Sequence, residues 1–168
     1  GHWNRQSRFP KVEPYLWKWT DIYAGLQKAG EIVPMDQTGR RTIQMKNPSL
    51  AAGMTHTIHL SVQLVKPGEI AQAHRHVAAA IRYIIKGSAT AWTIVEGERF
   101  PMEEGDLITT PNWTWHDHYN GSDGPVIWLD GLDVRLVSYL NAQFQEKFAR
   151  EQQPVEKPDG YSSKILGL

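Results

Sequence analysis

The sequence predicts an all-β domain with an N-terminal arm and short helices at its ends. Three observations lead to this prediction. Residues 57–65 alternate apolar and polar side chains, as in a half-buried antiparallel strand. Several short apolar segments follow between residues 81 and 130, and Gly97 and Gly105 mark turns between them. No long helical pattern interrupts this series, which favours a barrel or a sandwich.

Composition limits the classes of protein that the chain can belong to. Its 168 residues are 40% hydrophobic and 21% charged, enough for one domain with a sizeable core. The 18 Lys and Arg residues balance the 18 Asp and Glu residues, so the chain has no net positive charge that would attract nucleic acid or an anionic membrane. The sequence lacks an apolar run of about 20 residues and a secretory signal, which makes a cytoplasmic protein the expectation.

The first 52 residues are expected to form an arm with a short helix. Residues 3–19 are aromatic and interrupted by prolines, which predicts an arm that packs on the domain. A helix over residues 21–29 follows, with Thr20 as its N-cap and Gly30 as its stop. A loop and a strand are expected over residues 31–47.

Residues 53–133 are expected to form the barrel. In the segment 57–65, Ile58, Leu60, Val62 and Leu64 lie on one face, and His59 and Gln63 lie on the other. The polar face either meets water or lines a cavity. Further strands are predicted over residues 81–86, 90–95, 99–102, 107–110, 114–120 and 126–130.

Residues 134–168 are expected to form a C-terminal helix and a tail. Leu136, Leu140, Phe144 and Phe148 recur every four residues, which predicts an amphipathic helix. The tail from Glu151 onward contains two prolines and is interpreted as a linker.

Four of the seven histidines lie in two short strings, His74-Arg75-His76 and His116-Asp117-His118. Residues i and i+2 of a strand share a face, so each pair can aim two imidazoles at one point. Imidazole is a common ligand of zinc, iron, copper and nickel, and the chain has no cysteine to serve instead. A surface pair of histidines is the alternative.

These histidines lie in a pattern that resembles the two cupin motifs. Gly68, His74, His76 and Gly87 match the first motif, and the second is matched by Gly105, Pro111, His116 and Asn120. The resemblance implies a jelly-roll barrel in which His74, His76 and His116 bind a metal ion. Ala80 stands where the first motif usually has a glutamate, so the implied site has three histidines and no carboxylate.

The strings PGEIAQAHRHVAAAIRYIIKG, VEGERFPMEEGDLITTPNWTWHDHYN and PVIWLDGLD resemble the gentisate 1,2-dioxygenase family, which includes salicylate and 1-hydroxy-2-naphthoate dioxygenases. The match is specific over residues 54–140. It implies Fe(II)-dependent cleavage of a 2-hydroxybenzoate by O2, between the carboxyl-bearing and hydroxyl-bearing carbons. Gentisate is the leading substrate, and salicylate, substituted salicylates and 1-hydroxy-2-naphthoate stay open.

The same resemblance implies roles for other residues. Arg82, together with Arg40 or Arg41, would hold the substrate carboxylate, although a buried Arg82 could instead pair with a structural carboxylate. His118 would contact oxygen species and would be oriented by Asp130. The remaining pocket residues implied are Gln63, His59 and Trp128, the last of which plain core packing would also explain.

Two alternatives from other classes stay open. One is a cupin that binds a metal or a small carboxylate without oxidative chemistry, and the other is a Zn- or Mn-dependent isomerase or hydrolase. The family resemblance also implies two cupin domains per chain, of which this sequence matches the metal-bearing first one. It is either a fragment or a short member, and the surface left uncovered leads us to expect a homo-oligomer.

Overall fold

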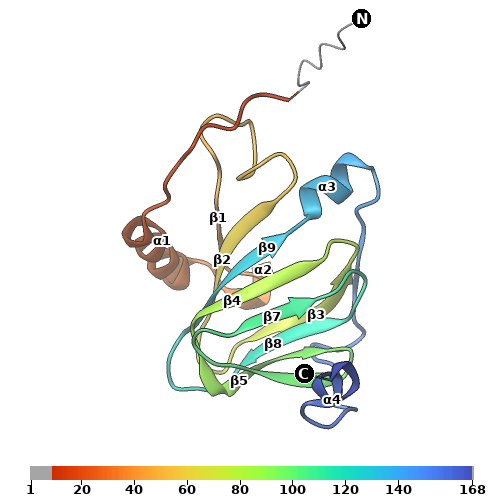
Figure 1. Cartoon of the computed structure of the whole chain (residues 1–168). Coiled ribbons are helices and arrows are strands. Elements are labelled where there is room, and N and C mark those ends of the chain that lie inside the picture. Colours follow the sequence, from red (N-terminus) through yellow and green to blue (C-terminus); the bar gives the residue numbers. More distant parts are fainter. Residues whose placement is uncertain (1–8, 168) are drawn as a thin grey trace, which may run out of the picture.

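The chain folds into two five-stranded antiparallel sheets that face each other in this computed structural model, which describes residues 9–167 (Figure 1). Residues 3–8 of the expected arm lie outside the described residues. The first sheet consists of β1 (Thr42–Gln44), β2 (His59–Val65), β9 (Val126–Leu132), β4 (Ala80–Lys86) and β7 (Leu107–Thr110), in that order. The second consists of β10 (Gln145–Lys147), β3 (Ile70–His76), β8 (His116–Asn120), β5 (Ser88–Val95) and β6 (Glu98–Met102). The all-β prediction is confirmed.

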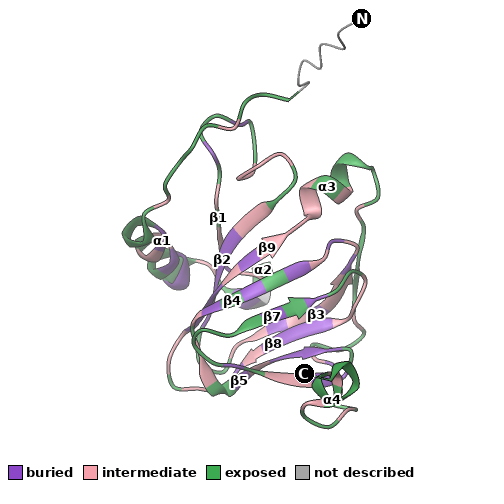
Figure 2. Cartoon of the chain, viewed as in Figure 1, coloured by how far each residue is buried: buried purple, intermediate pink, exposed green. Residues whose placement is uncertain are grey.

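Both faces of β2 are covered, and this places its polar residues inside the molecule (Figure 2). Val62 and Leu64 pack with Ile22 and Leu26 of the first helix in one apolar cluster. On the opposite face Val65 joins the core between the sheets. His59, Ser61 and Gln63 share that inward face, so the polar side of the strand lines a cavity between the sheets.

The first helix is longer than predicted, because neither of its expected ends is used. Helix α1 spans Trp19–Ile32, so Thr20 and Gly30 both lie inside it, and no side chain caps its N-terminus. Gly30 is buried, and a Cβ there would lie 3.1 Å from a methyl of Leu64. This glycine allows the helix to approach β2 closely. The helix ends before Pro34, whose preceding residue is disfavoured in helical conformation.

The helix predicted after Asp133 forms, but it ends at Tyr139, and its predicted continuation to Phe148 is wrong. Helix α3 spans only Val134–Tyr139, and strand β10 follows it and pairs with β3. The four-residue spacing of Phe144 and Phe148 fits a strand as well as a helix, since residues i and i+4 share a face in both. Their rings pack on Trp113 and Trp115, in the segment that leads into β8, at centroid distances of 4.7 and 4.9 Å.

The tail is not a free linker. The backbone N–H and side-chain amide of Gln153 both donate to Asp117, at 2.9 and 3.1 Å. A short helix α4 (Tyr161–Leu166) follows, and the backbone N–H of Ser162 donates to Glu98. The tail therefore packs along the outside of the second sheet. Within the described part of the chain, no helix combines the length and apolar character needed to cross a membrane.

Candidate metal centre and substrate cavity

Three histidines converge between the two sheets. His74 and His76 extend from the same face of β3, and His116 begins the neighbouring strand β8, directly opposite His74 in the ladder. Their candidate ligand atoms all lie within 4.8 Å of one another. Side-chain alternation along β3 places His74 and His76 on one face, and the antiparallel pairing with β8 brings His116 beside them. The three imidazoles can hold a metal ion.

The imidazoles are oriented by backbone carbonyl groups. The Nδ1 atoms of His74, His76 and His116 lie 3.0, 2.7 and 2.9 Å from the carbonyl oxygens of Gln72, Ala78 and Thr114. If each Nδ1–H donates to its carbonyl, each Nε2 keeps a lone pair for a metal. Nε2 of His116 is buried and has no hydrogen-bond partner among residues 9–167. An orphaned acceptor of this kind fits a metal ion.

No carboxylate joins the three imidazoles. Ala80 is buried where the cupin motif usually has a glutamate. Asp130 lines the same cavity, but Arg82 and Trp128 already occupy its two oxygens. The donor set within the described residues is therefore three neutral nitrogens.

Burial keeps these histidines neutral. It lowers the pKa of His74 to about 3, with the charge of Arg40 as the second cause. Burial likewise lowers the pKa of His76, His116 and His118 below the usual 6.5, and Arg82 adds to the effect on each. Metal ligation requires neutral imidazole, so at neutral pH the site needs to release no protons from these rings.

The metal-free protein should lose stability as the pH falls from 7.5 to 5.5. The four cavity histidines have folded pKa values below 6.5, so in this window the unfolded chain takes up protons that the folded chain does not. The free energy of unfolding therefore falls as the pH falls, by about 1.4 kcal/mol per pH unit for each such proton.

Urea unfolding at pH 7.5, 6.5 and 5.5 checks this expectation. Burial raises the pKa of Asp117 and Asp130, and proton uptake by these carboxyls in the folded chain acts in the opposite sense to that of the histidines. A free energy of unfolding that stays constant or rises toward pH 5.5 would contradict the assignment of neutral, buried histidines.

His74, His76 and His118 border a cavity of about 380 Å³ between the sheets, and His116 lies buried behind them. Its wall is almost entirely polar, with Leu132 as the single aliphatic side chain among the described lining residues. The lining consists of Arg40, Thr42, Gln44, His59, Ser61, Gln63, His74, His76, Arg82, His118, Asp130, Leu132 and Gln145. A cavity with this lining suits a small polar ligand.

Comparisons with known proteins agree with this arrangement. Residues 61–132 match the sequence family described as a cupin domain. The chain is 43% identical over 149 residues to the 1-hydroxy-2-naphthoate 1,2-dioxygenase of Nocardioides sp., covering 87% of this chain and 38% of that protein. It is 42% identical over 169 residues to the 5-aminosalicylate 1,2-dioxygenase of Comamonas sp., covering 96% of this chain and 45% of that protein.

A solved structure shows the same fold. The salicylate 1,2-dioxygenase of Pseudoaminobacter salicylatoxidans, in a crystal with gentisate, superposes with a TM-score of 0.81 at 32% identity. The match covers 90% of this chain and 42% of that one. The chain has the cupin fold, and over most of its length it is similar to the gentisate and salicylate dioxygenases. It spans less than half the length of these relatives.

The cupin cavity brings together most of the residues implied by the sequence. Arg40, His59, Gln63, Arg82, His118 and Asp130 all line it. Trp128 is fully buried in the core behind the cavity, where its ring packs on His118 at a centroid distance of 4.8 Å. Trp128 thus belongs to the support of the cavity and does not line it.

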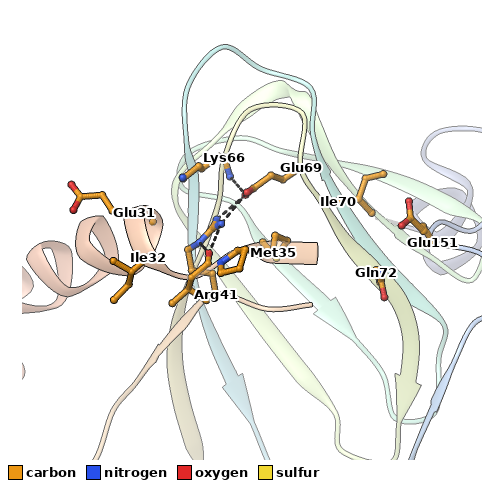
Figure 3. Close-up of a pocket in the computed structure, with 12 residues that line it drawn as sticks. Glu31, Ile32, Met35, Arg41, Lys66, Glu69, Ile70, Gln72 and Glu151 are labelled. Carbon is orange, nitrogen blue, oxygen red and sulfur yellow. Dashed lines mark hydrogen bonds and ion pairs between the residues drawn. The ribbon is translucent and has the colours of Figure 1, made fainter. Parts of the chain in front are cut away.

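Arg41 does not face the cavity. Its guanidinium is buried on the far side of β2, where it donates to Glu69 at 2.7 and 2.9 Å and to the carbonyl of Val33 (Figure 3). The expectation that Arg41 holds a substrate carboxylate is therefore wrong, because Glu69 already neutralises it. The pair fastens the end of α1 to the turn before β3.

Arg82 has a structural carboxylate as its partner. Its Nε lies 3.1 Å from Oδ1 of Asp130 without hydrogen-bond geometry, and its Nη1 donates to Thr110. The second oxygen of Asp130 accepts a hydrogen bond from Trp128, at 2.8 Å. The expected hydrogen bond from an N–H of His118 to the carboxylate of Asp130 is not formed, and Nδ1 of His118 has no partner in the described chain.

Arg40 is the cavity cation without a carboxylate partner among the described residues. Its Nη2 lies 2.6 Å from Nδ1 of His74 and 3.0 Å from the carbonyl oxygen of Gln72, and Nη1 donates to Gly39. Burial and the nearby charge of Arg82 lower the pKa of Arg40 to about 10, which leaves it charged at neutral pH. Nδ1 of His74 cannot both donate to the carbonyl of Gln72 and accept from Arg40. When it donates to Gln72, the guanidinium of Arg40 lacks this acceptor, and an anion bound in the cavity would replace it.

Four polar lining residues escaped the sequence analysis. Thr42 and Gln44 alternate on β1, and Ser61 lies between His59 and Gln63 on β2, so strand parity alone would have found Ser61. Gln145 gave no such signal, because the helix expected there placed it away from the barrel. It reaches the cavity from β10, opposite His76 in the ladder.

Proposed function

We propose that this cupin is the metal-bearing part of an Fe(II)-dependent dioxygenase that opens the ring of a 2-hydroxybenzoate such as gentisate. The observation that carries the proposal is the three-histidine centre beside Arg40, which has no carboxylate partner among the described residues. Salicylate, substituted salicylates and 1-hydroxy-2-naphthoate are the other candidate substrates, as the names of the relatives suggest.

The charges of the cavity suit an anionic chelating substrate. Three neutral imidazoles leave the full charge of a divalent ion, one unit more than a site with two histidines and a carboxylate. Arg82 and Asp130 neutralise each other, and Arg40 contributes a further positive charge. A substrate that brings a carboxylate and an ortho oxygen would be attracted to both the ion and Arg40.

Each cavity residue then has a defined task. Arg40 takes the substrate carboxylate, and the side-chain N–H of Gln63, which has no partner in the described chain, donates to a substrate oxygen. His118 lies two residues from His116 and is held neutral, so it can bond an oxygen species or move a proton. His59, whose pKa is lowered by burial and by Arg135, faces the opposite wall and meets a ring substituent.

Bound Fe(II) would supply the redox chemistry that couples an electron-rich ring to O2, without a second cofactor. The carbon–carbon bond between the carboxyl-bearing and hydroxyl-bearing carbons breaks, both oxygen atoms enter the product, and gentisate would give a maleylpyruvate-type keto acid. The protein side chains hold both reactants within reach of each other.

Oxygen uptake by the anaerobically Fe(II)-loaded protein tests the proposal. Gentisate, salicylate, 5-aminosalicylate and 1-hydroxy-2-naphthoate are supplied in turn, with absorbance followed for the ring-opened product. Uptake matched to product formation supports the dioxygenase. Absence of uptake with every acid, in a protein that binds Zn as tightly as Fe, would contradict it and favour a binding cupin or a Zn-dependent hydrolase.

We also propose that the chain associates with itself. The outer face of the first sheet exposes Ile81, Tyr83 and Leu107 at 51, 47 and 63% of their surface. A depression of about 410 Å³ beside Ile81 is lined almost wholly by apolar atoms. Such a face is normally covered. Light scattering on the sample used for oxygen uptake gives the mass, and a strictly monomeric protein would contradict this expectation.

A further inference from the structure

The outward face of the ligand strand carries an unusual cluster. Arg75 lies between His74 and His76, and its side chain points away from the cavity. Its guanidinium carbon lies 4.3 Å from the ring centroid of Trp113 and 4.3 Å from that of Trp115, so the cation sits between two indoles. Glu146 of β10 accepts two hydrogen bonds from it, at 2.9 and 2.6 Å.

Two further rings close this cluster from the side of β10. Phe144 packs on Trp113 and Phe148 packs on Trp115. We call the set of Arg75, Trp113, Trp115, Phe144, Glu146 and Phe148 the aromatic clamp. It joins three segments that are distant in the sequence: β3, the segment before β8, and β10.

The clamp lies where the regular ladder between β3 and β8 stops. That ladder is irregular between Ala71 and His74, and its last pair is His74 with His116. Residues 111–115, which lead into His116, are outside the strand. Trp113 has φ of 60°, which residues other than glycine rarely adopt, and its N–H donates to the carbonyl of His76 at 2.8 Å.

We propose that the aromatic clamp positions the metal centre. By stacking on Trp113 and Trp115, Arg75 holds the segment 111–115 against β3. This contact fixes the position of His116 relative to His74 and His76. The inference rests on the proposal that these histidines bind a metal. A planar guanidinium can stack on two rings at once while it donates to a carboxylate, whereas an ammonium group cannot. Arg75 is thus a positioning residue on the strand that carries two of the three candidate ligands.

The chain offers a matched control in Arg99. This residue also lies over an indole, that of Trp92 at 5.7 Å, and forms an ion pair with Asp159 at 2.9 Å. It belongs to β6, at the other edge of the sheet from the ligand strand. Loss of Arg99 removes a contact of the same kind, with one indole instead of two, and leaves the segment before His116 in place.

Co(II) binding to the full chain tests the proposal, because Co(II) reports both affinity and ligand geometry through its visible spectrum. The variant Arg75→Gln should bind Co(II) about 10–100-fold more weakly, as when a partner that orients a metal ligand is lost. Its spectrum should also change. Arg75→Lys should fall between this variant and the wild type, and Arg99→Gln should match the wild type.

Thermal unfolding without metal separates positioning from plain stability. If Arg75→Gln melts earlier but keeps the wild-type Co(II) affinity and spectrum, the clamp does not position the centre and the inference is overturned. If Arg75→Gln does not fold, Trp115→Phe and Glu146→Gln replace it, and wild-type binding in both overturns the inference. A wild-type chain that binds no Co(II) overturns the metal centre itself.

Discussion

Replacing His116 with alanine should abolish specific metal binding. The imidazole is almost fully buried, and its unpartnered Nε2 completes the three-nitrogen group with His74 and His76. Loss of a group that merely orients a ligand costs about 10–100-fold in metal affinity, so removal of a ligand should cost more than about 100-fold. Competition titrations with Fe(II) and Co(II) at pH 7.5 measure the change, and oxygen uptake should disappear with it.

The control for this variant is His56→Ala. His56 lies at the surface, where its Nε2 contacts the carbonyl of Pro10, and it is not part of the metal-binding group. This variant should keep the wild-type affinity. If His116→Ala still binds Fe(II) with an affinity near that of the wild type, the three-histidine centre is not the metal site.

Arg40→Met should weaken substrate binding and leave metal binding intact or slightly tighter. The guanidinium has no carboxylate partner in the described chain, so a substrate carboxylate is its natural anion. A hydrogen bond to a charged group contributes about 1.5–3 kcal/mol, which corresponds to about 10–100-fold in dissociation constant. Removal of a positive charge beside His74 also relieves its repulsion of a metal ion. Anaerobic titration of the Fe(II)-loaded protein with gentisate and salicylate measures both effects.

Arg82→Met provides the contrast. It leaves Asp130 buried without its cation and should lower the free energy of unfolding by about 3–5 kcal/mol. The double variant Arg82→Met, Asp130→Asn removes both charges and should recover much of that loss. The assignment of substrate binding to Arg40 and of a structural role to Arg82 would be contradicted if both variants weakened substrate binding equally and had the same free energy of unfolding.

Much of the site was predictable because it depends on local periodicity. The alternation within β2 and β3 selects His59, Gln63, His74 and His76 without any knowledge of distant contacts. The ion pair between Arg82 and Asp130 joins strands β4 and β9, and side-chain partners across a sheet are not encoded in the spacing of either residue. The family resemblance favoured a substrate role for Arg82, and the structure shows the other alternative, a structural carboxylate. The cavity cation without a carboxylate partner among the described residues is Arg40.

The C-terminal part shows a different limit. A four-residue apolar repeat is compatible with a helix and with a strand, and the choice between them is made by what the segment meets. Here the segment meets the edge of β3 and two partly buried indoles, and it pairs there as a strand. Arg41 illustrates the same point, since Glu69, its partner, lies 28 positions away.

Successive side chains of β3 point to opposite sides of the sheet. His74 and His76 therefore point into the cavity, and Arg75 between them points away from it. A deletion or insertion of a single residue between the turn at Gly68 and His74 would exchange these sides, if the pairing with β8 and β10 held. A cation would then occupy the place of the imidazoles, and the imidazoles would face the indoles. Length changes in this segment should therefore be accepted only in steps of two residues, which makes it a poor place for loop grafting in engineered variants.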